Sequence, residues 1–149
     1  MKIIIREIAR NYPLTLLLSA DPDIRKIEKY LNKGRCFGAF LKETVIGEYV
    51  LKDIKNGAAE IKNLAVDEKF KRRGVGRELI ENAIERARGE GFRVLEIATG
   101  KDTMPQRFYE SCGFKVYETD EGYFTRNYAE KIIEDGLEIK DQVRMRRPL

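Results

Sequence analysis

Apolar residues recur at helical spacing after the segment Gly74–Gly76 and predict an amphipathic helix. They share one face of that helix: Leu79, Ile80, Ala83, Ile84 and Ala87. Gly89 and Gly91 end the pattern. The next apolar run, Val94–Ala98, is nearly continuous, which is typical of a strand buried on both faces. Together with a strand predicted at Ala59–Val66, it makes a βαβ unit with parallel pairing.

The first half of the chain predicts a strand, two short helices and a hairpin. Asp21 is the predicted N-cap of the second helix, Pro22 its first residue, and Gly34 its end. The Asn56-Gly57 pair predicts a tight primed turn into the next strand. The predicted elements are a strand at Lys2–Ile8, helices at Leu14–Leu18 and Asp21–Leu31, and strands at Cys36–Leu41 and Val45–Ile54.

The last third of the chain is less regular. Thr103–Cys112 is predicted to be a helix that Gly113 breaks, and Phe114–Glu118 is predicted to be a strand. A final strand is predicted around Gln142–Arg146. The intervening Tyr123–Gly136 shows no clear period, so we expect a loop there.

Length and composition limit the function classes. The 149 residues predict one domain, residues 1–149. The absence of histidine excludes His-based triads and His-containing zinc sites, and Cys36 and Cys112 are too few for a four-ligand zinc site. We therefore expect no metal, and two buried thiols in a reduced compartment. No apolar run approaches the roughly 20 residues that cross a bilayer, and Met1–Ile5 does not resemble a signal peptide, so we expect a cytoplasmic protein.

Basic residues and glycines stand where the predicted strand gives way to the helix, in the order Lys71, Arg72, Arg73, Gly74, Val75, Gly76 and Arg77. The first amides of a helix lack internal partners, and the helix dipole adds partial positive charge there. Glycines also let a ligand approach the backbone closely. The segment therefore predicts a phosphate site. A dinucleotide fingerprint would need glycine in place of Leu79, and the Gly-Lys-Ser/Thr of a P-loop is absent.

Residues 71–76 resemble the Gln/Arg-x-x-Gly-x-Gly/Ala motif of the GNAT superfamily of N-acetyltransferases, with Lys71 at the first position. A second family element, a Tyr followed closely by Gly-Phe, matches Tyr109, Gly113 and Phe114. The resemblance implies an α/β (α+β) fold, with a mixed, mostly antiparallel twisted sheet, a central parallel βαβ unit and flanking helices. It also implies acetyl-CoA (coenzyme A) as cosubstrate, with its pyrophosphate held by Lys71–Arg77.

The same resemblance implies residues for direct transfer of an acetyl group to a primary amine. A base is needed because an alkyl ammonium with a pKa of about 10.4 must lose a proton. Glu60 is the predicted general base, with Glu48 and Glu96 as alternatives. Tyr109 is the predicted acid for the departing thiolate. Cofactor contacts are predicted from a splayed strand, which also supplies the oxyanion donor, and from nearby side chains: Leu64, Ala65, Val66, Thr99, Asp102 and Phe108.

Some positions depart from the family pattern. Asp102, Pro105 and Ser111 stand where GNAT chains often carry Asn, Ala and Lys, so the pyrophosphate cradle is better matched than the adenosine side. The stretch from Phe124 to Tyr128 resembles a small uncharacterised-type GNAT subgroup, which names no substrate.

Two other function classes stay open at this point. A non-catalytic acyl-CoA-binding or sensor module on the same fold would keep the basic turn and lose the chemistry, although Glu60 and Tyr109 argue against it. A nucleic-acid-binding protein would use Lys69–Arg73 and a solvated tail at Arg144–Arg147, but the net charge is only +4 and no aromatic–basic groove pattern is present. A homodimer is the default expectation. The acceptor is not identified, and the carboxylates considered for attracting a cationic amine are Glu28, Glu43 and Asp120.

Overall fold

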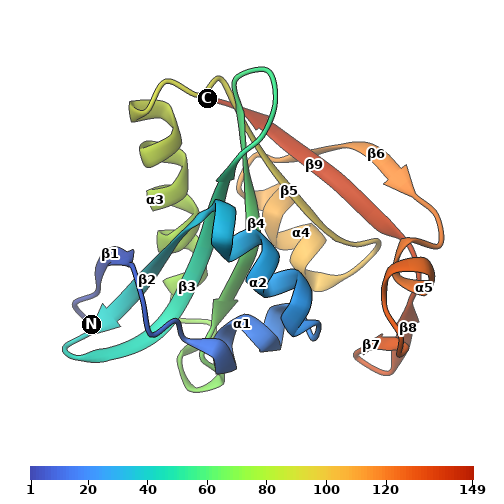
Figure 1. The fold of residues 1–149 in the computed structure, drawn as a ribbon, viewed down its shortest axis with the longest axis horizontal. Coiled ribbons are helices and arrows are strands. Elements are labelled where there is room, and N and C mark those ends of the chain that lie inside the picture. The colour runs from blue at the N-terminus through green and yellow to red at the C-terminus, as the bar shows by residue number, and fades with distance from the viewer.

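One mixed sheet of seven strands organises the computed structural model, which describes residues 1–149 (Figure 1). The strand order is β1-β2-β3-β4-β5-β9-β6, and only β4 and β5 pair in parallel. The prediction of a mostly antiparallel sheet around one parallel βαβ unit is therefore confirmed. The strands are β1 (Ile4–Ile8), β2 (Arg35–Leu41), β3 (Thr44–Asp53), β4 (Ala58–Val66), β5 (Val94–Gly100), β6 (Lys115–Asp120) and β9 (Gln142–Pro148).

Helices cover both faces of this sheet. On one face, α1 (Leu14–Ala20) and α2 (Ile24–Lys33) pack over β2, β3 and β4 and bury Leu17 and Ile27 in a small core. On the other face lie α3 (Val75–Gly89) and α4 (Met104–Ser111). A short 3-10 helix, Glu68–Phe70, connects β4 to the start of α3. None of the helices is both long and apolar enough to span a membrane.

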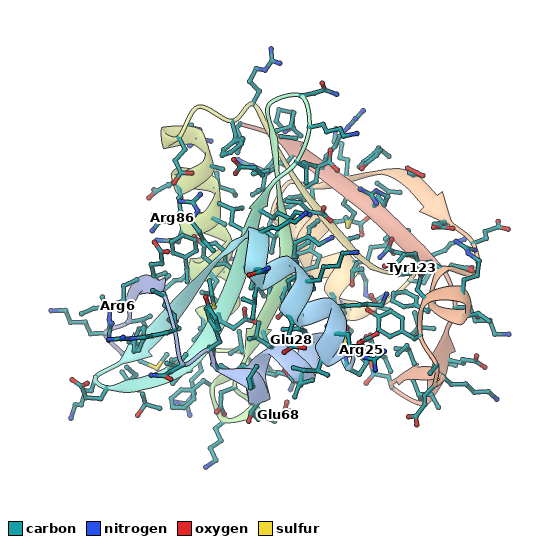
Figure 2. The ribbon with its side chains drawn as sticks, viewed as in Figure 1. Arg6, Arg25, Glu28, Glu68, Arg86 and Tyr123 are labelled. Atoms are coloured by element: carbon teal, nitrogen blue, oxygen red, sulfur yellow. The ribbon has the colours of Figure 1, made fainter.

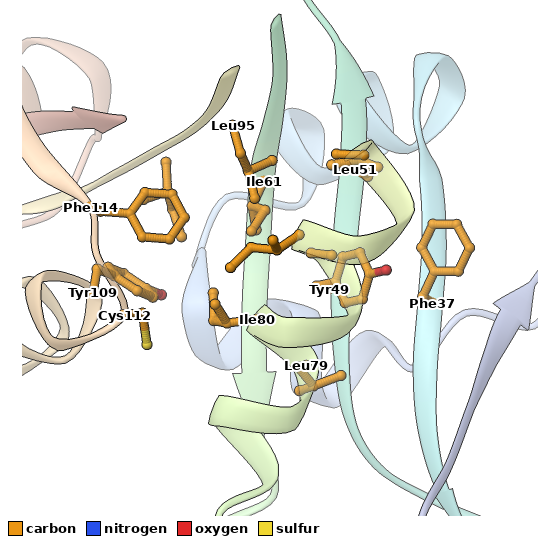
Figure 3. Packing of buried hydrophobic residues seen from close by; sticks show 14 of the residues in the cluster. Phe37, Tyr49, Leu51, Ile61, Leu79, Ile80, Leu95, Tyr109, Cys112 and Phe114 are labelled. Carbon is orange, nitrogen blue, oxygen red and sulfur yellow. The ribbon is translucent and has the colours of Figure 1, made fainter. Parts of the chain in front are cut away.

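The larger core lies between the sheet and α3, where the predicted apolar stripe meets the strands (Figure 3). Leu79 and Ile80 are fully buried and pack in the same cluster as Tyr49 and Leu51 of β3. The ring of Phe37 stacks on Tyr49 with centroids 5.0 Å apart. Burying one such side chain contributes about 1.5–3 kcal/mol, so this stripe fixes α3 on the sheet.

The predicted N-cap of α2 was wrong by two residues. Asp23 caps the helix, because its Oδ1 accepts hydrogen bonds from the amides of Arg25 (2.9 Å) and Lys26 (3.4 Å). The helix begins at Ile24, which leaves Asp21 outside it with a buried carboxylate. That carboxylate is then available for contacts with distant parts of the chain.

The prediction that β5 is buried on both faces was also wrong. Leu95 and Ile97 are buried in the larger core, but Val94, Glu96 and Ala98 on the other face are only half-buried. An apolar composition alone did not reveal this difference, because Ala98 on that second face borders a cavity and Glu96 bonds to Tyr117.

The segment Tyr123–Gly136, predicted to be a loop, contains regular structure. It holds α5 (Tyr123–Asn127) and β7 (Ile132–Glu134), and β7 pairs with β8 (Leu137–Ile139) in a separate two-stranded hairpin. These elements have only three to five residues each, which is too short to produce a detectable period.

The basic run Arg144–Arg147 is part of β9, between β5 and β6, and is not the solvated tail that we expected. Arg147 Nη1 donates to the Cys112 carbonyl (2.9 Å) and Arg144 Nε donates to the Tyr117 hydroxyl (3.1 Å). The run therefore stabilises the fold.

The predicted primed turn is confirmed, since Asn56 and Gly57 both have positive φ, 63° and 76°.

β4 and β5 diverge part-way along their length. They pair only from Ala58–Ile61 against Val94–Ile97, although β4 continues to Val66 and β5 to Gly100. The second half of β4 is therefore bonded to β3 on one side and has no strand partner on the other. This divergence opens a gap in the middle of the sheet, between its two helical layers.

Candidate functional site

The segment Lys71–Arg77 forms a turn in which the backbone amides of residues 72–77 are free. Arg72 and Gly74 have positive φ, 63° and 85°. The first hydrogen bond of α3 runs from the Glu78 amide to the Gly74 carbonyl (3.0 Å), and no side chain caps the helix, so the amides of residues 72–77 make no hydrogen bond within the protein. A turn of this kind forms a concave anion site, and the helix start adds partial positive charge.

Four cations surround these amides. The Lys71 ammonium lies 2.7 Å from the exposed Glu68 carboxylate, and the Arg73 guanidinium lies over the ring of Phe70, 5.6 Å from its centroid. Arg77 Nη2 donates a hydrogen bond to Ser111 Oγ (3.1 Å). Arg72 is exposed and makes no side-chain hydrogen bond or ion pair.

The two glycines leave the surface of the turn open. A Cβ at Gly74 would meet no atom within 4 Å, and one at Gly76 would only reach ordinary contact with the Phe108 ring at 3.5 Å. Free amides, an open backbone and several cations together match what a pyrophosphate needs. The residues present therefore fit the phosphates of coenzyme A.

Phe108 and Tyr109 lie beside this turn on α4. Phe108 packs under Gly76 and below the Arg77 guanidinium, which is 5.8 Å from its ring centroid. The Tyr109 ring packs edge-on against Phe114 with centroids 6.2 Å apart and extends from α4 toward Ile80 (Figure 3). Burial raises the pKa of the Tyr109 hydroxyl above its ordinary value, so this group stays protonated.

A cavity of about 410 Å³ lies on the opposite face of the sheet, over the diverging ends of β4 and β5. Glu60, 7% exposed, and Thr99 contribute to its floor, and the Glu60 carboxylate lies 3.5 Å from the Lys62 ammonium. Since side chains alternate along β4, Glu60 points away from the larger core that buries Ala59 and Ile61. The basic turn and Tyr109 thus lie on one side of the gap, and Glu60 lies on the other.

A polar network that no sequence pattern predicted closes one wall of this cavity. Asp21 accepts hydrogen bonds from the hydroxyls of Tyr30 (3.1 Å) and Tyr128 (3.0 Å), which lie far apart in the chain. Asn63 Nδ2 on β4 donates to the same Tyr30 oxygen (2.8 Å) and to the Leu17 carbonyl (3.0 Å). Burial and the neighbouring Asp21 charge raise the pKa of both tyrosines, so they remain donors.

Comparison with known proteins decides the family. The model of the acetyltransferase (GNAT) family matches residues 3–114. The chain belongs to the GNAT family. Within this family, a curated relative, the uncharacterized N-acetyltransferase YvbK of Bacillus subtilis, is 37% identical over 131 residues, which cover 87% of this chain and 84% of that protein.

Solved structures of GNAT proteins agree over the whole length. An IAA acetyltransferase from Bacillus cereus has a TM-score of 0.95 and 37% identity, with 99% of this chain and 100% of that chain covered. A GNAT family acetyltransferase from Elizabethkingia anophelis with acetyl-CoA bound has a TM-score of 0.94 and 34% identity, covering 99% and 98%. The predicted family, fold, enzyme class and cosubstrate are confirmed: this chain is an acetyl-CoA-dependent N-acetyltransferase that acts on an amine.

The remaining predicted GNAT site residues fall into two groups. Leu64, Ala65 and Val66 lie on the part of β4 that faces the gap. Asp102 does not join them, because its amide donates to Gln106 Oε1 (2.6 Å) and it lines a separate shallow depression with Lys101 and Lys140. It therefore stays a predicted cofactor contact that the geometry does not bring to the turn.

The two alternative bases lie outside the cavity. Glu48 is fully buried on β3 and does not line it. Glu96 Oε1 accepts a hydrogen bond from the Tyr117 hydroxyl (2.6 Å) and lies 3.7 Å from the Arg144 guanidinium. Of the three carboxylates considered for attracting a cationic amine, Asp120 pairs with Arg126, and none lines the cavity.

Proposed function

We propose that this GNAT protein transfers an acetyl group from acetyl-CoA directly to a primary amine, with Glu60 as general base and Tyr109 as general acid. The observation that carries the proposal is the gap between β4 and β5. The basic turn lies on one side of this gap, and a cavity lined by the Glu60 carboxylate lies on the other. Acetyl-CoA supplies a reactive thioester. Everything else in the reaction is positioning, proton transfer and charge stabilisation by the chain.

The turn Lys71–Arg77 holds the pyrophosphate through its free amides, and its cations add attraction for the phosphate charges. Ser111 replaces the lysine that is common at this position, but its hydroxyl accepts a hydrogen bond from Arg77, which brings a guanidinium to the same place. Lys71 in place of Gln or Arg changes little, since backbone amides make most of the cradle.

The Glu60 carboxylate receives the proton of the acceptor amine, directly or through a water molecule. An alkyl ammonium with a pKa of about 10.4 is almost fully charged at neutral pH. The nucleophilic amine therefore forms only if a base removes a proton from the ammonium. Glu60 and Thr99 both line the cavity beside the gap, which supports Glu60 as this base. Lys62, 3.5 Å away, gives the carboxylate a cationic neighbour.

On the other side of the gap, Tyr109 donates the proton that the leaving thiolate needs. Burial raises its pKa, which keeps the hydroxyl protonated until a stronger base forms beside it. A backbone N–H of the segment 64–66, on the part of β4 that has no strand partner toward β5, is the donor for the developing oxyanion. A donor of this kind typically contributes about 2.7–4 kcal/mol to transition-state stabilisation.

The test is release of free thiol from acetyl-CoA over a panel of primary amines, for the wild type and for Glu60→Gln. We expect Glu60→Gln to lower kcat by about 100-fold or more near pH 7 while acetyl-CoA affinity stays the same. The deficit should shrink as the pH rises toward the pKa of the amine, because free base then forms without help.

The control is Glu81→Gln, a matched change on the exposed face of α3 that should leave turnover unaltered. Full turnover by Glu60→Gln would assign the base elsewhere. Calorimetric binding of acetyl-CoA without thiol release on any amine would favour a non-catalytic acyl-CoA sensor.

A further inference from the structure

The cavity beside Glu60 carries more positive charge than its carboxylates balance. Only three acidic residues line it, namely Asp21, Glu60 and Glu134. The cations that line it are twice as many: Lys26, Lys29, Lys33, Lys52, Lys62 and Arg144. An acceptor site built for a polycation would show the opposite balance, because like charges in a cleft repel the ligand.

Two of the three carboxylates are also already engaged. Asp21 accepts from two tyrosine hydroxyls and from the Asp23 amide at 3.1 Å. Glu60 faces the Lys62 ammonium at 3.5 Å and serves as the proposed base. The Glu134 carboxylate makes no hydrogen bond or ion pair, and burial raises its pKa above the ordinary value. Only Glu134 is left for a second ammonium group on the acceptor, against four lysines without a carboxylate partner.

Four of the lysines have no carboxylate within ion-pair distance. Lys26, Lys29 and Lys33 follow one another at helical spacing, so they form a stripe along the side of α2 that borders the cavity. Lys52 joins them from β3, where it stands directly opposite Glu60 in the strand pairing. An anionic group beside Glu60 would therefore find unpaired ammonium groups on two walls.

The wall opposite α2 is aromatic. Tyr123, Phe124 and Tyr128 of the α5 region line the cavity, with Tyr123 and Phe124 in edge-on contact at 5.1 Å. Figure 2 shows the Tyr123 side chain projecting from α5 toward α2. The Asp21–Tyr128 hydrogen bond holds this wall against the chain preceding α2. Such a wall offers apolar contact to the body of a small molecule.

We propose that the acceptor is a small primary amine that also carries a carboxylate or phosphate group and an apolar body. This inference rests on the proposed function, with the amine at Glu60 and the acid group at the lysines of α2 and β3. The volume of about 410 Å³ lies within the range of small-molecule sites, which is about 300–1,000 Å³. A polyamine would bring extra ammonium groups against unpaired lysines.

The first experiment measures thiol release with acceptors that differ only in the acid group. Phenylalanine is compared with phenylalaninamide, O-phosphoethanolamine with ethanolamine, and spermidine represents the polycations. We expect kcat/KM to be about 5-fold or more higher for the acid-bearing member of a pair, with the advantage falling as salt is added. The two pairs distinguish carboxylate from phosphate. Equal or better turnover of the neutral members or of spermidine would overturn the inference.

The second experiment uses charge reversal on the exposed part of the stripe. Lys29→Glu/Lys33→Glu should raise KM for the acid-bearing acceptors and leave KM for acetyl-CoA unchanged. Lys55→Glu/Lys115→Glu is the matched control, since both residues are exposed and lie outside the cavity. If Lys29→Glu/Lys33→Glu kept the wild-type preference for acid-bearing acceptors, the inference would also be contradicted.

Calorimetric titration of phenylalanine and phenylalaninamide into the protein with coenzyme A separates the two proposals. Binding that favours phenylalanine without thiol release would leave the inference standing and refute the proposed reaction. Thiol release without any preference for acid-bearing amines would support the proposed reaction and refute the inference about the acceptor.

Discussion

Glu48 is a buried carboxyl that the fold leaves without a partner. It is 0% exposed on β3, and neither carboxyl oxygen has a hydrogen-bond donor or acceptor. A polar group buried without a partner typically costs about 1–3 kcal/mol. Glu48→Met keeps the length of the side chain and removes both oxygens, so we expect the free energy of unfolding to rise by about 1–3 kcal/mol. For a protein of this size, that corresponds to an increase in Tm of about 2–12 °C.

The same residue predicts how stability depends on pH. Burial raises the pKa of Glu48 well above its ordinary value, so the folded state keeps a proton that the unfolded chain releases above about pH 4.3. The unfolded state then binds fewer protons, and the free energy of unfolding falls as the pH rises above that value. Glu48→Gln cannot ionise, so its stability should decline less between about pH 5 and about pH 8.

The assay is urea and thermal unfolding of the wild type, Glu48→Met and Glu48→Gln across that pH range. Glu85→Met, on the exposed face of α3, is the control for the methionine substitution and should move Tm little. Thiol release should persist in Glu48→Met, since Glu48 does not line the cavity. A loss of stability in Glu48→Met, or a wild-type pH slope in Glu48→Gln, would refute the reasoning and mean that the carboxyl is charged or bonded in solution.

Two further predictions concern the cofactor side. Tyr109→Phe should lower kcat by about 100-fold or more with little change in acetyl-CoA affinity, because it removes only the proton donor; unchanged turnover in the thiol assay would exclude the role. Gly74→Ala should lower the free energy of unfolding by about 1–2 kcal/mol, because φ there is 85°. Gly76→Ala should leave Tm nearly unchanged, because the new Cβ only touches Phe108, and it should raise KM for acetyl-CoA. A lower Tm for Gly76→Ala than for Gly74→Ala would contradict this prediction.

The shape of the basic turn was predictable because its information is local. The seven residues from Lys71 to Arg77 are consecutive, and the phosphate site proposed there depends on backbone geometry at the start of one helix. The stripe of α3 and the Asn56-Gly57 turn were predicted correctly for the same reason. Each follows from the period or the chemistry of neighbouring residues.

The cavity proposed for the acceptor was not predictable, because its residues meet only in the folded chain. The Asp21–Tyr128 hydrogen bond joins residues 107 positions apart, and a capping rule placed Asp21 in the wrong role. The lysines at positions 26, 29 and 33 look like an ordinary solvated helix face until β3 and α5 are placed around them. Short elements such as α5 and β7 add to the difficulty, since their sequences carry no period.

This division has a consequence for how acceptor specificity is set. The phosphate turn, Tyr109 and the core that supports them lie on the α3 and α4 side of the sheet, while the lysine stripe and the aromatic wall lie on the other side. The two halves lie on opposite faces of one sheet, and the gap between β4 and β5 separates its strands there. Substitutions in α2 or α5 can therefore change which amine enters without altering the cradle for acetyl-CoA. Charge reversal on α2 should then shift KM for the acceptor alone, because the altered side chains reach no atom of the turn.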